Sequence, residues 1–461
     1  MAEPPPNPPP SAESQPGSQP APPWEIPRPP ASPPVPEPDR ALLERAAEHQ
    51  RQGAWLEAAA IYTALAEAHP HDHRLWANQG NALWLVDLPE AGARAYRRAL
   101  ALQPDSSVSL RGLASCLRDL NRWPEALRAR ELAAPLIAAG SDEEAMNRWS
   151  ASQLLVGLQR WPEAFAAMAR RHHPPGAAPL DLLQPRLVLE TEQGYGDTFQ
   201  FLRFLVELVQ HRHAAGCQDP VDLRVEPNLV ELLAEGLAWL PAPPRLHPVA
   251  PPAAPASPLP TPTPTPTLLD LPHHLGITAI RPPAAYLRSP LWPEHQRRDG
   301  PPRVGLCWAA GRKLDDPFTA REYRKRTLPP AVLWRLLEGL RQRGASVLSL
   351  QVGDDADTAS ALGFPLEDPP EPIAGFLGTA RVLQQLDLLV SVDTALAHLA
   401  GAMHRPAWIL LPWSADPRWL ESGPATPWYG SLRLFRQPRS GDWHGAVDAL
   451  LAAWDAEPVH H

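Results

Sequence analysis

The 461-residue sequence has little cysteine and no surplus of positive charge. Its three cysteines, Cys116, Cys217 and Cys307, lie far apart and form no CxxC pair, which argues against a disulfide framework and against a zinc site. The 42 lysine and arginine residues are outnumbered by 51 acidic residues, for a formal net charge of −9. A protein that binds the phosphate backbone needs the opposite balance, so nucleic acid is not an expected partner.

Long apolar runs are also missing. No uncharged stretch approaches the ~18 apolar residues of a membrane-spanning helix, and the N-terminal residues do not place basic side chains before an apolar run. We therefore predict no membrane span and no export signal, and we expect a cytoplasmic protein. Attachment to the periphery of the inner membrane through another protein leaves no mark in a sequence and stays open.

Proline is the residue in excess, with 62 copies. Residues 1–38 hold 17 of them and residues 241–267 hold 12, and neither segment has the apolar periodicity of a packed element. We predict that residues 1–38 form a disordered tail and that residues 241–267 form an extended insert. Proline makes a helix or a central strand improbable in both.

An internal repeat follows the tail. Residues 39–72 and 73–106 align at a 34-residue period, and Ala58, Tyr62 and Pro70 fall opposite Gly92, Tyr96 and Pro104. The segment 123–126 (WPEA) recurs at 161–164, so the pattern extends at a looser period. These features resemble the tetratricopeptide family, which implies about four helical hairpins over residues 39–176. Repeat aromatics normally pack against neighbouring hairpins, so we assign them no chemistry, but the concave face of such an array is suited to a protein partner.

Beyond residue 176 the pattern becomes one of short apolar runs alternating with helical stretches, which predicts parallel α/β structure. The expected strands are 187–190, 221–225, 304–308, 347–350, 388–392, 408–411 and 432–435. The expected helices include 198–210, 329–343, 373–386 and 443–454. We predict a first lobe over 183–288, which contains the insert 241–267, and a second lobe over 300–456.

The first candidate site is a glycine-rich turn, residues 192–198, between a strand and a helix. Gly194 and Gly196 leave room for a ligand, and Asp197 is either a helix cap or a ligand-facing carboxylate. A dinucleotide fingerprint is not satisfied because Phe199 stands where a third small residue is needed, so we do not expect NAD.

The second candidate site begins at the end of an apolar strand, with Asp393 and Thr394 at the start of a helix. The amides and positive dipole end of such a helix can hold a diphosphate. His398 lies four residues beyond Thr394, on the same helical face. The alternative interpretation is an ordinary helix cap followed by a core histidine.

The turn 192–198, the segment 305–311 (GLCWAAG) and the segment 391–402 (SVDTALAHLAGA) occur in the order seen in a known family. They resemble the ADP-heptose:lipopolysaccharide heptosyltransferases, glycosyltransferase family 9, some of which are fused to tetratricopeptide repeats. The likeness covers roughly residues 183–456. The C-terminal part is similar to the tail of the repeat-fused members at Trp413, Asp416, Arg418, Trp419, Leu420 and residues 427–429 and 433–437.

The resemblance implies a GT-B arrangement, in which two Rossmann-like lobes hold the acceptor on the first and a nucleoside-diphosphate sugar on the second. Asp197 matches the family's catalytic base, beside Gly194 and Gly196. The diphosphate-binding turn is matched by Asp393, Thr394, Ala395, Leu396 and His398. The implied reaction inverts the anomeric carbon and needs neither a metal nor a cofactor, with the nucleotide sugar as donor substrate.

Positive charge for the diphosphate must then come from side chains. The basic run 321–327 contains Lys325 and Arg326 at the place of an arginine-containing element in the family. Such a run is either a solvated surface or a phosphate site. The preceding segment 309–323, expected as a loop, differs from the family's usual version, and the pair Asp355 and Asp357 is not expected to bind metal.

Two functions from different classes follow. The first is an inverting, metal-independent glycosyltransferase whose repeat array recruits a glycan, lipid or protein acceptor. The alternative is a non-catalytic repeat scaffold that carries a degenerate glycosyltransferase domain, suggested by a first lobe that is short for a complete Rossmann-like half.

Overall fold

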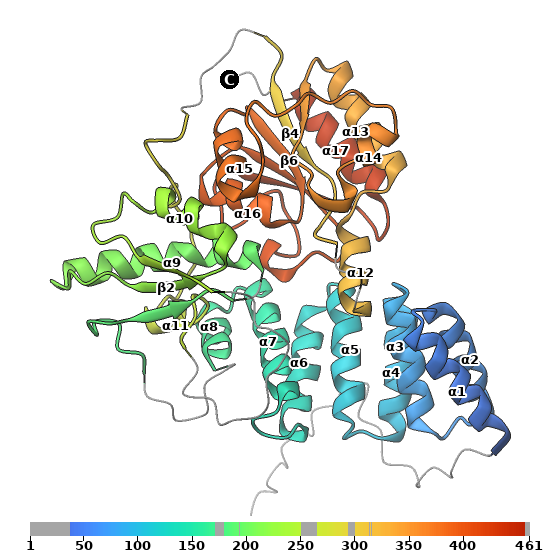
Figure 1. The fold of residues 1–461 in the computed structure, drawn as a ribbon. Coiled ribbons are helices and arrows are strands. Elements are labelled where there is room, and N and C mark those ends of the chain that lie inside the picture. Colours follow the sequence, from blue (N-terminus) through green and yellow to red (C-terminus); the bar gives the residue numbers. More distant parts are fainter. Residues whose placement is uncertain are drawn as a thin grey trace, which may run out of the picture.

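The computed structural model describes residues 37–170, 179–192, 194–249, 265–293, 300–312, 314 and 316–456. A helical array, a small parallel sheet and a larger parallel sheet follow one another along the chain (Figure 1). The predicted class, helical repeats followed by an α/β region, is confirmed. The predicted tail lies outside the described residues apart from its last two positions, which belong to the first helix.

The array contains eight helices within the described residues, and each packs against the next one along the chain. They are α1 (Glu37–Arg51), α2 (Trp55–Ala68), α3 (His73–Leu85), α4 (Pro89–Leu102), α5 (Ser107–Asp119), α6 (Trp123–Ala133), α7 (Asp142–Gly157) and α8 (Trp161–Ala169). The second helix of each hairpin starts with a tryptophan or a proline, and proline is favoured at the first helical position because its fixed φ suits the helix.

The turn inside each hairpin contains one residue in the left-handed region of the backbone. These residues are Gly53 (φ 73°), Asp87 (φ 63°), Asn121 (φ 56°) and Gln159 (φ 57°). Each stands two positions before the second helix of its hairpin. Glycine and asparagine adopt this conformation readily, so the turn is a second repeat signal that the sequence comparison did not use.

The repeat aromatics are core residues, as expected. Tyr96 is buried between neighbouring hairpins, and a Cβ atom added at Gly80 or Gly112 would lie 2.9 Å and 2.1 Å from its ring. The small residues are therefore required for the close approach of α3, α4 and α5 around this ring.

In the described part of the chain, the first sheet has three parallel strands in the order β1-β2-β3: β1 (Val188–Glu190), β2 (Asp222–Val225) and β3 (Arg245–Pro248). Helix α9 (Tyr195–Ala214) joins β1 to β2, and α10 (Val230–Gly236) lies between β2 and β3. On the other side of β1, Thr267 pairs with Glu190 in a parallel bridge.

Strand β3 lies within the proline-rich insert 241–267, which was expected to be extended and for which no strand was predicted. Its residues Arg245 to Pro248 pair with β2. The strand is at the edge of the sheet, where one side needs no ladder hydrogen bonds and proline is tolerated. Residues 250–264 of the insert lie outside the described residues.

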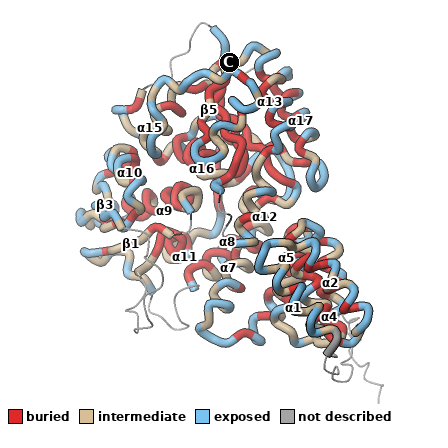
Figure 2. Tube along the Cα trace, turned by 45° about the vertical axis from the view of Figure 1, so that its right-hand side comes forward, coloured by how far each residue is buried: buried red, intermediate tan, exposed pale blue. Residues whose placement is uncertain are grey.

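Over the residues that the structure describes, the second sheet has five parallel strands in the order β5-β4-β6-β7-β8. They are β4 (Arg303–Cys307), β5 (Ser346–Ser349), β6 (Leu388–Val392), β7 (Ala407–Leu411) and β8 (Leu432–Arg436). Helices α13 (Pro330–Gln342) and α17 (Trp443–Ala456) pack on one face, and α15 (Gly375–Gln384) and α16 (Ala395–Ala402) pack on the other (Figure 1). Every residue of β6 and β7 is buried, which explains their continuous apolar runs (Figure 2).

Helix α12 (Pro317–Arg326) takes the place of the C-terminal part of the loop expected over 309–323. Asp316 caps it by accepting a hydrogen bond from the Thr319 amide at 2.8 Å. The helix lies between the second sheet and the array, where Phe318 stacks on Trp84 with ring centroids 5.9 Å apart (Figure 1). The basic run was not predicted to be buried, but the Arg321 side chain is only 2% exposed.

One continuous core joins the later hairpins, the first sheet and one face of the second sheet. Trp161 of α8 meets Trp428 edge to face at 5.7 Å, and Phe165 of α8 meets Phe204 of α9 at 6.0 Å. Such aromatic pairs bury large areas, so the array is held against the α/β region by the same packing that stabilises each part.

Candidate functional site

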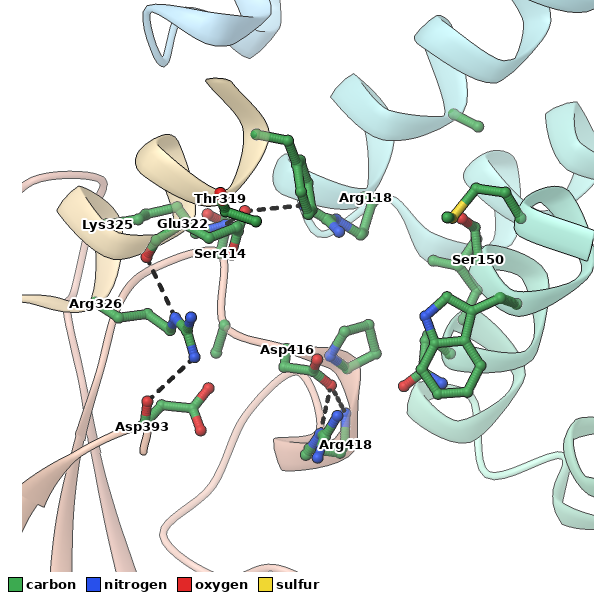
Figure 3. A pocket seen from close by; sticks show the side chains of 18 of the residues that line it. Arg118, Ser150, Thr319, Glu322, Lys325, Arg326, Asp393, Ser414, Asp416 and Arg418 are labelled. Carbon is green, nitrogen blue, oxygen red and sulfur yellow. Dashed lines mark hydrogen bonds and ion pairs between the residues drawn. The ribbon is translucent and has the colours of Figure 1, made fainter. Parts of the chain in front are cut away.

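A cavity of about 700 Å³ lies where the array meets the α/β region. Its walls come from four places: helices α5, α6 and α7 of the array, the start of α9, helix α12, and the segments that follow β6 and β7. Lys325, Arg326 and Asp393 line it (Figure 3). Asp197 lines it too, so the cavity brings together residues from three separate predicted motifs. The volume is in the range of small-molecule binding sites.

The second-lobe side of the cavity is at a reversal of strand order. The chain moves outward from β4 to β5 in one direction and from β6 to β8 in the other. Ligands of open parallel sheets bind beyond the carboxyl ends of the strands at such a point. Arg326 lies at this point, since its Nη1 donates to the main-chain carbonyl of Asp393 at 3.3 Å. Thr327 next to it accepts from the Ala310 amide, at the end of β4, at 3.3 Å.

The helix that follows β6 begins as the sequence suggested, with one correction. Thr394 alone is the cap of α16, and its hydroxyl accepts from the Leu396 amide at 3.3 Å. The Leu396 amide therefore already donates a hydrogen bond to the cap. Ala395 occupies the first helical position, where the N–H has no partner within a helix, so its amide is the one this turn offers to a ligand.

His398 is a buried residue that does not line the cavity. Its Nδ1 lies 2.9 Å from the Tyr429 hydroxyl, its Nε2 lies 3.9 Å from Oδ1 of Asp393, and its ring stacks on Trp419 at 5.0 Å. Burial, together with the charge of Arg418, lowers the pKa of His398 well below its ordinary value. The imidazole is therefore neutral at physiological pH and lies beside the carboxyl group of Asp393.

The two glycines of the first turn have different surroundings. A Cβ atom at Gly196 would lie 2.8 Å from Cδ2 of His398 and 3.6 Å from Cα of Ala395. At Gly194 the nearest atom would be Oδ2 of Asp197, 3.8 Å away. Gly196 thus lets α9 approach α16, whereas only Gly194 leaves the open space that both were expected to provide.

Asp197 is in the first turn of α9, and Oδ2 accepts a hydrogen bond from the Gly194 amide at 3.3 Å. This is the capping role, but the other oxygen has a different partner. Oδ1 lies 2.7 Å from Nη1 of Arg418, which follows β7 in the second lobe. The same guanidinium contacts Asp416 through Nε at 3.0 Å and Gln200 through Nη1 at 2.8 Å.

Two carboxyl groups that line the cavity have pKa values shifted in opposite directions. Burial raises the pKa of Asp393 above its ordinary value, against the opposing charge of Arg326. Burial also acts on Asp416, but Arg418 outweighs it and lowers the pKa of that carboxyl. Paired groups with pKa values pushed apart are common at functional sites.

Lys325 and Arg326, both on α12, differ in their availability. Lys325 Nζ lies 3.2 Å from Glu322 and 3.7 Å from Asp119, so its charge is already balanced. Arg326 contacts only main-chain carbonyls among the described residues, those of Glu322 and Asp393. Of the two predicted phosphate ligands, Arg326 is the one that forms no ion pair among the described residues.

The aspartates 355 and 357 do not line this cavity, and Asp355 accepts a hydrogen bond from the Tyr323 hydroxyl at 2.8 Å. Within the described part of the chain, no group of three or more histidine, cysteine or acidic side chains is arranged to hold a metal ion. The helices in that part include none with the length and apolarity to cross a bilayer.

Comparison with known proteins found no matching family model. Protein FlbA of Caulobacter vibrioides is 26% identical over 432 residues, which cover 86% of this chain and 69% of FlbA. A likeness of that extent must run through both the array and the α/β region, because neither alone is long enough.

Two solved structures resemble this chain only with low TM-scores. An O-GlcNAc transferase variant from Thermobaculum terrenum aligns over 90% of this chain and 89% of its own, with 15% identity and a TM-score of 0.30. The MamA protein aligns over 29% of this chain and 72% of its own, with 15% identity and a TM-score of 0.27. Scores this low carry no structural argument, so the fold rests on the topology described above.

Sequence reasoning missed two parts of the site. Asp416 and Arg418 had a signal, because they belong to the C-terminal segment that resembles the repeat-fused glycosyltransferases, but no role was assigned to them. The cavity wall from α5, α6 and α7, which includes Arg118, Arg130 and Trp149, had no signal. A repeat pattern shows which residues face the core of the array, not which helix meets another domain.

Proposed function

We propose that this protein is an inverting glycosyltransferase that transfers a sugar from a nucleoside-diphosphate donor, without a metal ion, to an acceptor held against the repeat array. The observation that carries the proposal is the convergence of Asp197, Arg326 and Asp393 on one cavity. These residues come from separate motifs, and the cavity also has walls from both lobes and from the array. The segments that follow strands of two parallel sheets, β1 in the first and β6 and β7 in the second, contribute to its walls, which supports a GT-B arrangement.

The donor diphosphate would lie at the start of α16. The Ala395 amide, the positive end of the helix dipole and the guanidinium of Arg326 can all face the phosphate oxygens there. These groups would stabilise the charge that grows on the diphosphate as it leaves, which is the role a metal ion plays in other transferases. Asp393 holds Arg326 through its main-chain carbonyl, so it orients the cation.

The acceptor would enter between the array and Asp197. In this scheme the Asp197 carboxylate takes the proton of an acceptor hydroxyl while the hydroxyl oxygen bonds to the anomeric carbon. The bond from that carbon to the diphosphate oxygen breaks on the opposite face, so the configuration inverts. Arg418 holds the carboxylate of Asp197 in place at 2.7 Å.

A panel of ADP-, GDP-, UDP- and dTDP-sugars tests the proposal, with melting temperature and nucleotide release as readouts. The matched variants are Arg326→Gln and Arg324→Gln, because Arg324 is on the same helix but is exposed and does not line the cavity. We expect one donor to stabilise the wild type, through binding to the folded state, and expect this effect to be lost only in Arg326→Gln. Nucleotide release should continue in the presence of EDTA.

The outcomes separate the two functions. Stabilisation by one donor with slow nucleotide release would support an active transferase. The absence of a shift with every donor would sink the proposal and favour a repeat scaffold that acts through protein partners. Loss of nucleotide release in EDTA would refute metal independence alone. A peptide acceptor screen would then separate a protein-directed enzyme from one that acts on glycans or lipids.

A further inference from the structure

The charges that line the cavity are unevenly balanced. Three of its basic side chains, Arg118, Lys325 and Arg418, each lie within ion-pair distance of carboxylates. Among the described residues, the other two lining cations, Arg326 and Arg130, have no such partner. Arg326 belongs to the donor end described above. Arg130 is on α6, in the array.

Arg130 is nine-tenths buried and has only neutral partners in the described part of the protein. Nη2 donates to the Ser115 hydroxyl at 3.0 Å, and Nη1 lies 3.5 Å from Oδ1 of Asn147. Its Nε atom is buried, and no residue that the structure describes forms a hydrogen bond with it. Burial lowers the pKa of Arg130 to about 9, and the charges of Arg118 and Arg111 add to the effect.

A second unpartnered donor lies on the neighbouring helix. Gln153 of α7 lines the same cavity, and its Nε2 atom is buried without a hydrogen-bond partner among the described residues. A buried cation with neutral contacts and a buried amide donor both carry a desolvation cost. A bound anion would offset it, and a guanidinium suits a carboxylate or a phosphate because two parallel N–H groups can face two oxygens.

We propose that α6 and α7 form an oxyanion subsite in which Arg130 and Gln153 donate hydrogen bonds to a carboxylate or phosphate group of the acceptor. The assignment of this anion to the acceptor rests on the proposed function, whereas the binding of an anion does not. The array would then do more than recruit the acceptor. It would select an acidic one and fix it opposite the donor end of the cavity.

Titration of the full-length protein with inorganic phosphate and with acetate tests the subsite, at constant ionic strength and with melting temperature as the readout. Arg130→Met is compared with Arg128→Met, a matched control on the same helix whose side chain is 61% exposed. We expect apparent anion affinity to fall about tenfold or more in Arg130→Met, the loss typical of a charged hydrogen bond, and to stay unchanged in Arg128→Met. Tighter binding of phosphate or of acetate tells which group the acceptor carries.

Arg326→Met assigns the anion to one end of the cavity. Phosphate affinity that survives in Arg326→Met but not in Arg130→Met belongs to the array. Gln153→Met, which keeps the length of the side chain and removes the donor, should weaken the same anion several-fold and serves if Arg130→Met does not fold. Equal anion affinity in the wild type, Arg130→Met and Gln153→Met, or no anion dependence at all, would overturn the subsite.

Failure of the subsite and failure of the proposed function are distinguishable. Nucleotide sugars probe the donor end, and phosphate or acetate binding in Arg326→Met probes the array end. An intact anion site without donor binding would refute the transferase and keep the subsite. Donor binding without an anion site would keep the transferase and refute the subsite.

Discussion

Oδ1 of Asp197 and Nη1 of Arg418 lie 2.7 Å apart, and this ion pair joins the first lobe to the second. Both side chains are mostly buried, with exposed fractions of 16% and 13%. Burial alone would lower the pKa of Arg418, but Asp197 and Asp416 hold it well above its ordinary value. A permanent cation therefore keeps the Asp197 carboxylate in one orientation at the cavity.

Asp197→Asn should strongly reduce transfer while leaving the fold intact. The amide oxygen of asparagine can still accept from the Gly194 amide, but the side chain can no longer take a proton. General-base catalysis typically contributes about 10²- to 10⁴-fold, so we expect turnover to fall by about 10²-fold or more with donor affinity unchanged.

The matched control is Glu207→Gln on the same helix, where the side chain is 38% exposed and 3.6 Å from Arg203. Single-turnover rates and donor titrations with both variants provide the measurement. Full turnover in Asp197→Asn would remove the assigned base while leaving the fold assignment in place.

Gly196→Ala should destabilise the protein, and Gly194→Ala should have little effect on stability. The new methyl group at position 196 would meet the His398 ring at 2.8 Å and push α9 away from α16, an overpacking that costs about 1–3 kcal/mol. The methyl group at position 194 has no neighbour closer than 3.8 Å. Urea denaturation of both variants makes the comparison, and equal unfolding free energies would contradict the close approach of the two helices.

His398 should make the protein less stable as the pH falls from about 6.5 to 5. The folded state keeps the imidazole neutral, because its pKa is lowered well below the ordinary value, whereas the unfolded chain binds a proton below about pH 6.5. Stability is thus present above the unfolded pKa and lost below it, by up to about 1.4 kcal/mol per pH unit. The carboxyls of Asp416 and Glu322, whose pKa values are lowered, act at more acidic pH.

Two variants isolate this effect in thermal melts across that window. His398→Gln should flatten the loss of stability. Asp393→Asn should steepen the loss of stability at more acidic pH, because the raised pKa of Asp393 makes its own contribution more favourable as the pH falls toward the ordinary range of an aspartate. An unchanged slope in His398→Gln would show that the imidazole charges in the folded state.

Arg321 should contribute far more stability than an exposed arginine. Its Nη2 lies 2.6 Å from Asp87 and 2.8 Å from Asp119, both in the array, and its guanidinium covers the Trp84 ring at 4.8 Å. Removing one member of a buried charge network leaves the others uncompensated and typically costs about 3–5 kcal/mol. We expect Arg321→Met to lose that amount and to weaken donor binding, because α12 also carries Arg326.

Arg335→Met is the control, since Arg335 forms a half-exposed pair with Asp448 at 2.6 Å. Exposed pairs contribute about 0–1 kcal/mol. Chemical denaturation of both variants measures the loss of stability, and donor titration measures the loss of donor affinity. Similar losses in the two variants would mean that α12 does not couple the array to the second lobe.

The parts that were predicted well have strong local signals. Strands β6 and β7 are apolar throughout because a parallel sheet buries both faces, and all seven expected strands are present. Strand β3 was missed because its sequence, Arg245 to Pro248, is mostly exposed at a sheet edge and has no apolar pattern. Helix α12 was missed because its charged residues find their partners in the array, far away in the sequence.

The sequence by itself determined the helical repeats, the parallel α/β region and the positions of two turns, residues 192–198 and the one at Asp393 and Thr394. Each of these depends on periodicity or on backbone conformation within a few residues. Only the tertiary structure decided how these parts form one cavity. The contact of Gly196 with His398, the pair of Asp197 with Arg418 and the unpaired charge of Arg130 all depend on which surfaces meet. Charge compensation and close packing are properties of neighbours in space, and no local pattern encodes them.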